Sequence, residues 1–163
     1  MLQSGEDCSY LLRRLIRCAS EDIGLADPQA LNQALSAQQA YHLLGSPEGD
    51  LSIAQCVVYL ATAPKSNALY KAFKASSKSA AETGSCPPPL HILNAPTSLM
   101  KKEGYGVGYM YDHDLPHAFS GQNYFPENIN PQKYYHPVQR GFEREIEKRL
   151  AFWEKLRRRS SST

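Results

Sequence analysis

Proline and glycine divide the first half of the chain into segments with helical apolar spacing, and this punctuation constrains the fold more than any other feature. Asp27 and Pro28 suit a helix N-cap and first turn, and Gly45 suits the residue that follows a helix. Ser46 and Pro47 repeat the same start for a third helix. The pattern therefore predicts helices joined by short turns, which is the all-α class.

Further helices are expected before and after these two. The first covers residues 7–24 behind Asp7 as an N-cap, and a fourth follows Ser66 over residues 67–82. A short helix is expected at 95–104 and a last one at 138–159. The third, with Ser46 as its cap and Pro47 in its first turn, runs to residue 63 and is apolar on almost every side, so we expect it at the centre of a bundle.

The whole chain, residues 1–163, is expected to form a single helical domain. Its parts would be a helical core at 5–82, a connector with the short helix at 83–104, an ordered loop at 105–137 and the C-terminal helix at 138–159. The loop has no sustained periodicity of apolar residues, but it contains many prolines and aromatic residues. We expect it to be held on the helices by buried rings of five tyrosines: Tyr105, Tyr109, Tyr111, Tyr134 and Tyr135.

Composition excludes several classes of protein. The chain is 42% hydrophobic and 21% charged, which is ordinary for a globular domain, and its net charge of +2 is too small to argue for nucleic acid by itself. No apolar run approaches the ~20 residues of a membrane span, and none of the four cysteines forms a CxxC pair. Helical spacing begins by about residue 7, which suggests a segment of a longer protein.

The stretch KKEGYGVGYMYDHD invites a phosphate-binding interpretation that its spacing does not support. Gly104, Gly106 and Gly108 match neither the Walker loop nor GxGxxG, because Tyr109 takes the place of the third glycine. Four nearby residues carry metal-binding side chains, but at no familiar spacing: Asp112, His113, Asp114 and His117. We expect no catalytic, cofactor or metal site in this chain.

Two groups of basic residues leave a nucleic-acid surface open as an alternative to ordinary solvated helix faces. One group, on the first predicted helix, consists of Arg13, Arg14 and Arg17. The other, at the end of the last helix, consists of Lys155, Arg157, Arg158 and Arg159.

Four segments together resemble one family: RRLIRCASEDIGLADPQAL, AQCVVYLATAPKSNALYKAFKAS, HILNAPTSLMKKEGYGVGYMYDHD and YYHPVQRGFEREIEKRL. They are similar to the C-terminal region of the replication-associated recombination protein A (RarA, also called MgsA) AAA+ ATPases, which are related to the Werner helicase-interacting protein. The resemblance covers roughly residues 5 to 156.

The resemblance implies a helical domain like the oligomerisation collar of clamp-loader subunits, assembling a homotetramer. It implies that the parent protein is a DNA-dependent ATPase of replication, recombination and repair, cytoplasmic and nucleoid-associated, with no membrane partner. ATP and magnesium would bind upstream of this chain, which would itself be no enzyme. The alternative is a module that docks DNA or a single-stranded DNA-binding protein, with Arg13, Arg14 and Arg17 as its surface.

Overall fold

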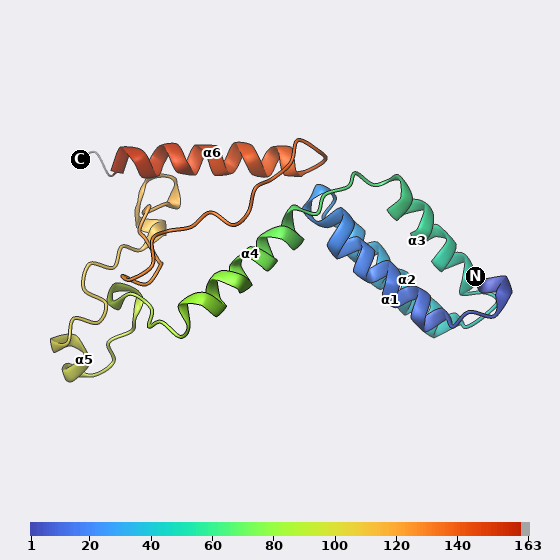
Figure 1. Ribbon diagram of the computed structural model, residues 1–163, viewed down its shortest axis with the longest axis horizontal. Helices are drawn as coiled ribbons and strands as arrows, with labels where there is room; N and C mark the ends of the chain where they lie inside the picture. The colour runs from blue at the N-terminus through green and yellow to red at the C-terminus, as the bar shows by residue number, and fades with distance from the viewer. Residues whose placement is uncertain (161–163) are drawn as a thin grey trace. The chain divides into compact units, whose positions relative to one another are not determined.

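The computed structural model describes residues 1–160, together with all of their side chains except those of Gln3 and Ser160. Every regular element in these residues is helical, with six α-helices and no strand, so the all-α prediction is confirmed (Figure 1). The chain divides into two compact units. Unit 1 comprises Met1–Ala75 and Tyr134–Glu147, and unit 2 comprises Ser76–Lys133 and Lys148–Thr163.

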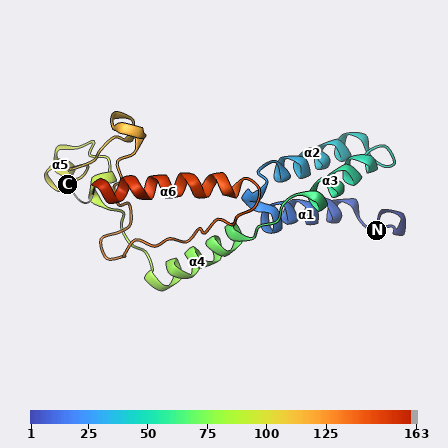
Figure 2. The same cartoon turned by 90° about the horizontal axis from the view of Figure 1, so that it is seen from above.

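Unit 1 is built on three helices that pack side by side, α1 (Cys8–Cys18), α2 (Gln29–Leu44) and α3 (Asp50–Thr62) (Figures 1 and 2). α2 contributes only alanines to the centre of the core, which lets its two neighbours approach closely. The core residues are Leu12, Ala19, Ile23, Ala30, Ala34, Ala37, Ile53, Cys56 and Leu60.

Side-chain caps begin three of the helices where the sequence predicts them. Asp7 Oδ1 accepts a hydrogen bond from the Ser9 backbone N–H, and Asp27 Oδ1 accepts one from Gln29, both at 3.0 Å. The Ser66 hydroxyl accepts a hydrogen bond at 3.2 Å from Ala68 N–H, at the start of α4 (Ala68–Thr83). These caps satisfy amide groups that the helix itself leaves without partners.

Three predicted helix boundaries are wrong. The first α-helix ends at Cys18, and a single π-helical turn, Ala19–Ile23, leads to Gly24. α3 begins at Asp50, because Ser46 and Pro47 lie in the turn after α2. α6 (Glu143–Ser160) begins five residues after position 138, because Phe142 N–H donates to Ala26 O at 2.8 Å and directs the preceding backbone toward another segment.

The expectation that the third helix lies at the centre of a bundle is also wrong. The buried residues of α3 are Ile53, Cys56 and Leu60, and Tyr59 packs against the same core while partly buried. Leu51 and Val58 are 75% and 64% exposed. A helix that is apolar on all sides thus has one side buried within the chain and another side open.

Unit 2 contains the short helix α5 (Ser98–Lys102), the loop that follows it and the C-terminal part of α6. The Phe119 ring lies nearly parallel to that of Trp153 on α6, with centroids 6.3 Å apart and an interplanar angle of 10°. The Arg157 guanidinium lies 5.4 Å from the centre of the Phe119 ring. These contacts hold the loop on α6.

Two of the five tyrosines expected to anchor the loop do not have buried rings. Tyr109 is 53% exposed and Tyr111 is 52% exposed. Polar groups hold this part of the chain instead: Gln122 Nε2 donates to Gly108 O at 2.7 Å, and Met110 N–H donates to Gln122 Oε1 at 3.1 Å. The spacing of aromatic residues could not predict this arrangement, because hydrogen bonds between one glutamine side chain and the backbone leave no pattern in the sequence.

Candidate assembly surface

The open side of α3 carries apolar residues at the spacing of a coiled-coil seam. Leu51, Ala54, Val58 and Ala61 follow one another at intervals of three, four and three residues, and all four are exposed. Seven residues make nearly two helical turns, so these side chains share one side of the helix. We call this set the α3 strip.

No charged residue interrupts the α3 strip. Between Leu51 and Ala63 the chain has no Asp, Glu, Lys or Arg. Other exposed apolar side chains of the helices α2 and α3 are Leu31, Leu35, Leu43, Leu44 and Val57. An exposed apolar strip of this kind is typical of protein–protein contact sites and offers no group for catalysis.

A buried carboxylate fixes the segment before α6 against the rest of unit 1. Glu143 is fully buried. Its Oε1 accepts a hydrogen bond from the Ser66 hydroxyl at 2.9 Å, and its Oε2 accepts one from Val138 N–H at 2.7 Å. Burial, with the neighbouring Glu143 carboxylate as a further cause, raises the pKa of Tyr135.

Sequence reasoning did not single out Glu143, although a signal was present. The residue stands three and seven positions before Ile146 and Leu150, so it occupies the inner side of α6 among apolar residues. An acidic residue on an apolar stripe needs hydrogen-bond donors around it. Ser66, predicted only as a cap, supplies one of them.

The three arginines of the predicted DNA surface, Arg13, Arg14 and Arg17, are exposed on α1, in unit 1. Arg17 Nε lies 2.6 Å from Glu21 Oε2, and this hydrogen-bonded carboxylate raises the pKa of Arg17. The guanidinium of Arg13 lies 6.0 Å from the centre of the Tyr10 ring. The structure thus places the three cations on one helix but pairs one of them with an acid.

The acidic and histidine residues of the glycine-rich stretch have local roles. Asp112 Oδ1 accepts a hydrogen bond from Ser120 N–H at 2.7 Å, and Ser120, through its side chain and its backbone, lowers the pKa of Asp112. The His117 ring meets Phe152 edge-on at 5.3 Å. Within residues 1–160, no three His, Cys, Asp or Glu side chains gather in a way that could hold a metal ion.

The described helices include none that is both long enough and apolar enough to span a membrane.

Comparison with known proteins gives a consistent result over most of the chain. A family model described as MgsA AAA+ ATPase C terminal matches residues 1–154. Replication-associated recombination protein A of Coxiella burnetii is 48% identical over 164 residues, which cover 100% of this chain and 37% of that protein. The protein of the same name in Escherichia coli K12 is 46% identical over 153 residues, covering 93% of this chain and 34% of that protein.

A eukaryotic relative is the ATPase WRNIP1 of Dictyostelium discoideum, which is 44% identical over 140 residues, 83% of this chain and 16% of that protein. The chain spans little more than a third of the length of the Coxiella burnetii and Escherichia coli proteins.

Proposed function

Because this chain belongs to the family of MgsA AAA+ ATPase C-terminal domains, we propose that it is the part of a larger AAA+ ATPase that holds its copies together. In this proposal the remainder of the protein binds ATP and magnesium and hydrolyses ATP in a DNA-dependent manner. The relatives' name, replication-associated recombination protein A, suggests a role in recombination associated with replication. We propose that the protein acts at replication forks, in the cytoplasm at the nucleoid.

The observation that carries the proposal is the α3 strip. A second copy of the chain presents the same strip, so two copies of α3 can pair about a two-fold axis. Residues at intervals of three and four fit the knobs-into-holes packing of paired helices, and the absence of charge means that pairing buries no unpaired ion. The proposal therefore names another copy of this chain as the occupant.

Further apolar surface on α2 supports an assembly larger than a dimer. A tetramer with three two-fold axes needs two different self-complementary surfaces. Leu31 and Leu35 stand four residues apart and are 38% and 39% exposed, and Leu43 is 86% exposed. We propose a homotetramer in which the α3 strip forms one contact and exposed leucines of α2 contribute to the other.

Light scattering coupled to size-exclusion chromatography tests this proposal. At tens of micromolar, the chain should elute at about four times its 18.2 kDa mass. Val58→Glu should reduce the mass, because it places a charge in the middle of the α3 strip. The matched control is Leu99→Glu on α5, since Leu99 and Val58 are both 64% exposed.

A monomeric wild-type chain would contradict the proposal and favour the alternative, a module that docks DNA or a single-stranded DNA-binding protein. If Val58→Glu leaves the mass unchanged and Leu99→Glu reduces it, the contact between copies lies in unit 2 and not on α3. Circular dichroism of each variant shows whether its helices are intact.

A further inference from the structure

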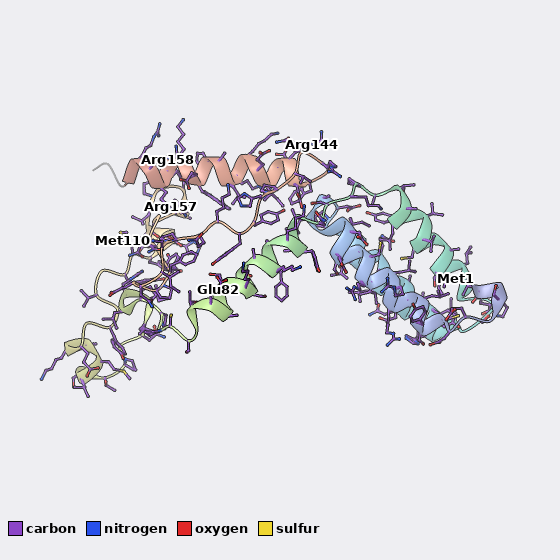
Figure 3. The ribbon with its side chains drawn as sticks, in the orientation of Figure 1. Met1, Glu82, Met110, Arg144, Arg157 and Arg158 are labelled. Carbon is purple, nitrogen blue, oxygen red and sulfur yellow. The ribbon has the colours of Figure 1, made fainter. Side chains whose placement is uncertain are left out.

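Large and small side chains alternate along the α3 strip in a symmetric arrangement. In chain order they are Leu51, Ala54, Val58 and Ala61. The intervals of three, four and three residues are the same from either end, so the centre of the strip lies midway between Ala54 and Val58. Figure 3 shows side chains of α3 that project away from α1 and α2. A second α3 turned end for end therefore presents its strip at the same spacing.

The direction in which two copies of α3 run decides which residues of the strip face each other. Two helices related by a two-fold axis are either parallel or antiparallel. In a parallel pair each residue faces its own equivalent, so Leu51 faces Leu51 and Ala54 faces Ala54. In an antiparallel pair centred on the strip, Leu51 of one copy faces Ala61 of the other, and Ala54 faces Val58.

The antiparallel pair fills the space between the helices more evenly. Every layer of that pair combines one large side chain with one alanine, so the two helix axes keep the same separation along the whole strip. In the parallel pair, layers of two large side chains alternate with layers of two alanines. The large layers hold the helices apart and the alanine layers leave voids, which destabilise a contact. The sizes of the side chains thus favour the antiparallel direction.

Charged residues flank α3 at its two ends, with opposite signs. Asp50 is its first residue, and Glu48 is exposed in the turn before it. Lys65 is exposed just after its end, where Lys65 Nζ donates to Leu60 O and Arg140 Nη1 donates to Lys65 O at 3.0 Å. An ammonium group has three donors, so the bond to Leu60 leaves two for another acceptor. The start of α3 is therefore acidic and its end is basic.

These charges favour the same direction as the sizes of the side chains. Antiparallel pairing brings Glu48 of one copy to the Lys65 end of the other, and the two-fold axis repeats this contact at the opposite end of the pair. It also sets the two helix dipoles in opposite directions, which is favourable. Parallel pairing would bring Glu48 beside Glu48 and Lys65 beside Lys65, and like charges repel.

We infer that two copies of the chain pair through antiparallel α3 helices, in the register that places Leu51 opposite Ala61 and Glu48 opposite Lys65. This inference rests on the assembly proposed above and fixes the direction and register of its α3 contact. A shift by seven residues keeps the same side of the helix in contact but leaves two of the four strip residues with nothing opposite them. The strip is thus long enough for one register only.

Disulfide cross-linking shows which positions face each other. Chains carrying Leu51→Cys and Ala61→Cys, one of them with a tag that changes its size, are expressed together, oxidised with diamide and separated on a denaturing gel. Antiparallel pairing predicts a mixed dimer. Neither variant alone should form more dimer than the wild type, whose four native cysteines make it the control. Two copies of position 51 would lie about 15 Å apart along the axis, too far for a disulfide.

The outcomes separate a wrong register from a wrong assembly. Dimers formed by each variant alone, without a mixed dimer, would show parallel pairing and overturn the inference. If no variant forms cross-links although light scattering gives about four times 18.2 kDa for variants and wild type alike, the contact is not the one inferred, while the assembly stands. A monomeric wild type would contradict the assembly itself and the inference with it.

Charge reversal tests the direction without changing the apolar residues. In sedimentation of a dilution series at low salt, Glu48→Lys or Lys65→Glu alone should weaken association about threefold to tenfold, because like charges then face each other at both ends.

The double variant Glu48→Lys/Lys65→Glu restores opposite charges and should associate within about twofold of the wild type, which loss of folding would not allow. The matched control is Glu82→Lys on α4 in unit 2, which should associate like the wild type (Figure 3). In a parallel pair neither single reversal changes the sign of the repulsion. Equal affinities for all these chains, or a double variant no better than the single ones, would therefore overturn the inference.

Discussion

Gly141 lies so close to the backbone of another segment that a side chain has no room. A methyl group there would stand 1.9 Å from Ala26 O and 2.8 Å from Pro64 Cγ, and the residue has φ +52°. Gly141→Ala should therefore lower the free energy of unfolding by about 3 kcal/mol or more, because backbone strain and a backbone clash combine. Urea denaturation followed by circular dichroism measures it.

The control for Gly141 is Gly108→Ala. Gly108 has φ +79° but nothing within 4 Å of the added methyl group. Gly108→Ala should lower the free energy of unfolding by about 1–2 kcal/mol, because only the left-handed backbone conformation is unfavourable for alanine there. Equal losses of stability for the two variants would show that the approach to Ala26 is not tight.

The Ser66 hydroxyl has two roles, since it caps α4 and donates to the buried Glu143 carboxylate. Ser66→Ala should lower the free energy of unfolding by about 2–4 kcal/mol, because it removes both a cap and a hydrogen bond to a buried charge. The control is Thr97→Ala, which removes only a cap. The Thr97 hydroxyl accepts a hydrogen bond from Met100 N–H at 3.2 Å, and its loss should lower the free energy of unfolding by about 1 kcal/mol. Similar costs in thermal or urea unfolding would contradict a stabilising role for the Ser66–Glu143 bond.

At the scale of elements, the loop of unit 2 depends on its packing against α6. Trp153 is the single tryptophan of the chain, so its fluorescence reports on this packing alone. Phe119→Ala should shift the Trp153 emission to longer wavelength, because water replaces the stacked ring, and should destabilise unit 2 by about 1–3 kcal/mol. An unshifted emission spectrum would mean that the loop does not rest on Trp153.

The same element contains a control for this prediction. Tyr111 packs on His113, at 5.1 Å between ring centroids. Tyr111→Ala should leave the Trp153 spectrum unchanged and alter stability by less than about 0.5 kcal/mol, as substitutions of exposed residues usually do.

At the scale of the whole molecule, three tyrosines of unit 1 couple stability to alkaline pH. Tyr59 donates a hydrogen bond to Asp27 Oδ2 at 2.8 Å, which raises the pKa of Tyr59. Hydrogen bonding with Cys8 is the main cause that raises the pKa of Tyr41 to about 12, and burial is the main cause for Tyr135. Each phenol thus holds its proton more tightly in the folded chain than in the unfolded one, where its pKa is about 10.

The sign of the effect follows from this difference. The stabilisation is complete below about pH 10 and is lost as pH rises toward 12, because the unfolded chain releases the protons first. The free energy of unfolding, measured at intervals from pH 9 to pH 11.5, should fall, and Tyr59→Phe should make the fall less steep. An identical slope in wild type and variant would exclude a contribution from Tyr59.

The sequence by itself determined the helical class, the family and three helix starts. Asp7, Asp27 and Ser66 cap as predicted because a cap forms between residues two positions apart and needs no distant partner. The wrong boundary at position 138 has the opposite cause. There the backbone is directed by a hydrogen bond to a residue far away in the sequence, the one between Phe142 and Ala26.

Tertiary structure alone decided which apolar and polar side chains are covered. Helical spacing shows that α3 is apolar on two sides, but only its packing on α1 and α2 shows that Ile53 is buried and Val58 is open. In the same way, only the tertiary structure shows that Glu143 is buried and that the Tyr109 ring, which was expected to be buried, is exposed. Burial depends on what lies opposite a residue in space, and a local pattern of hydrophobicity carries no information about that neighbour.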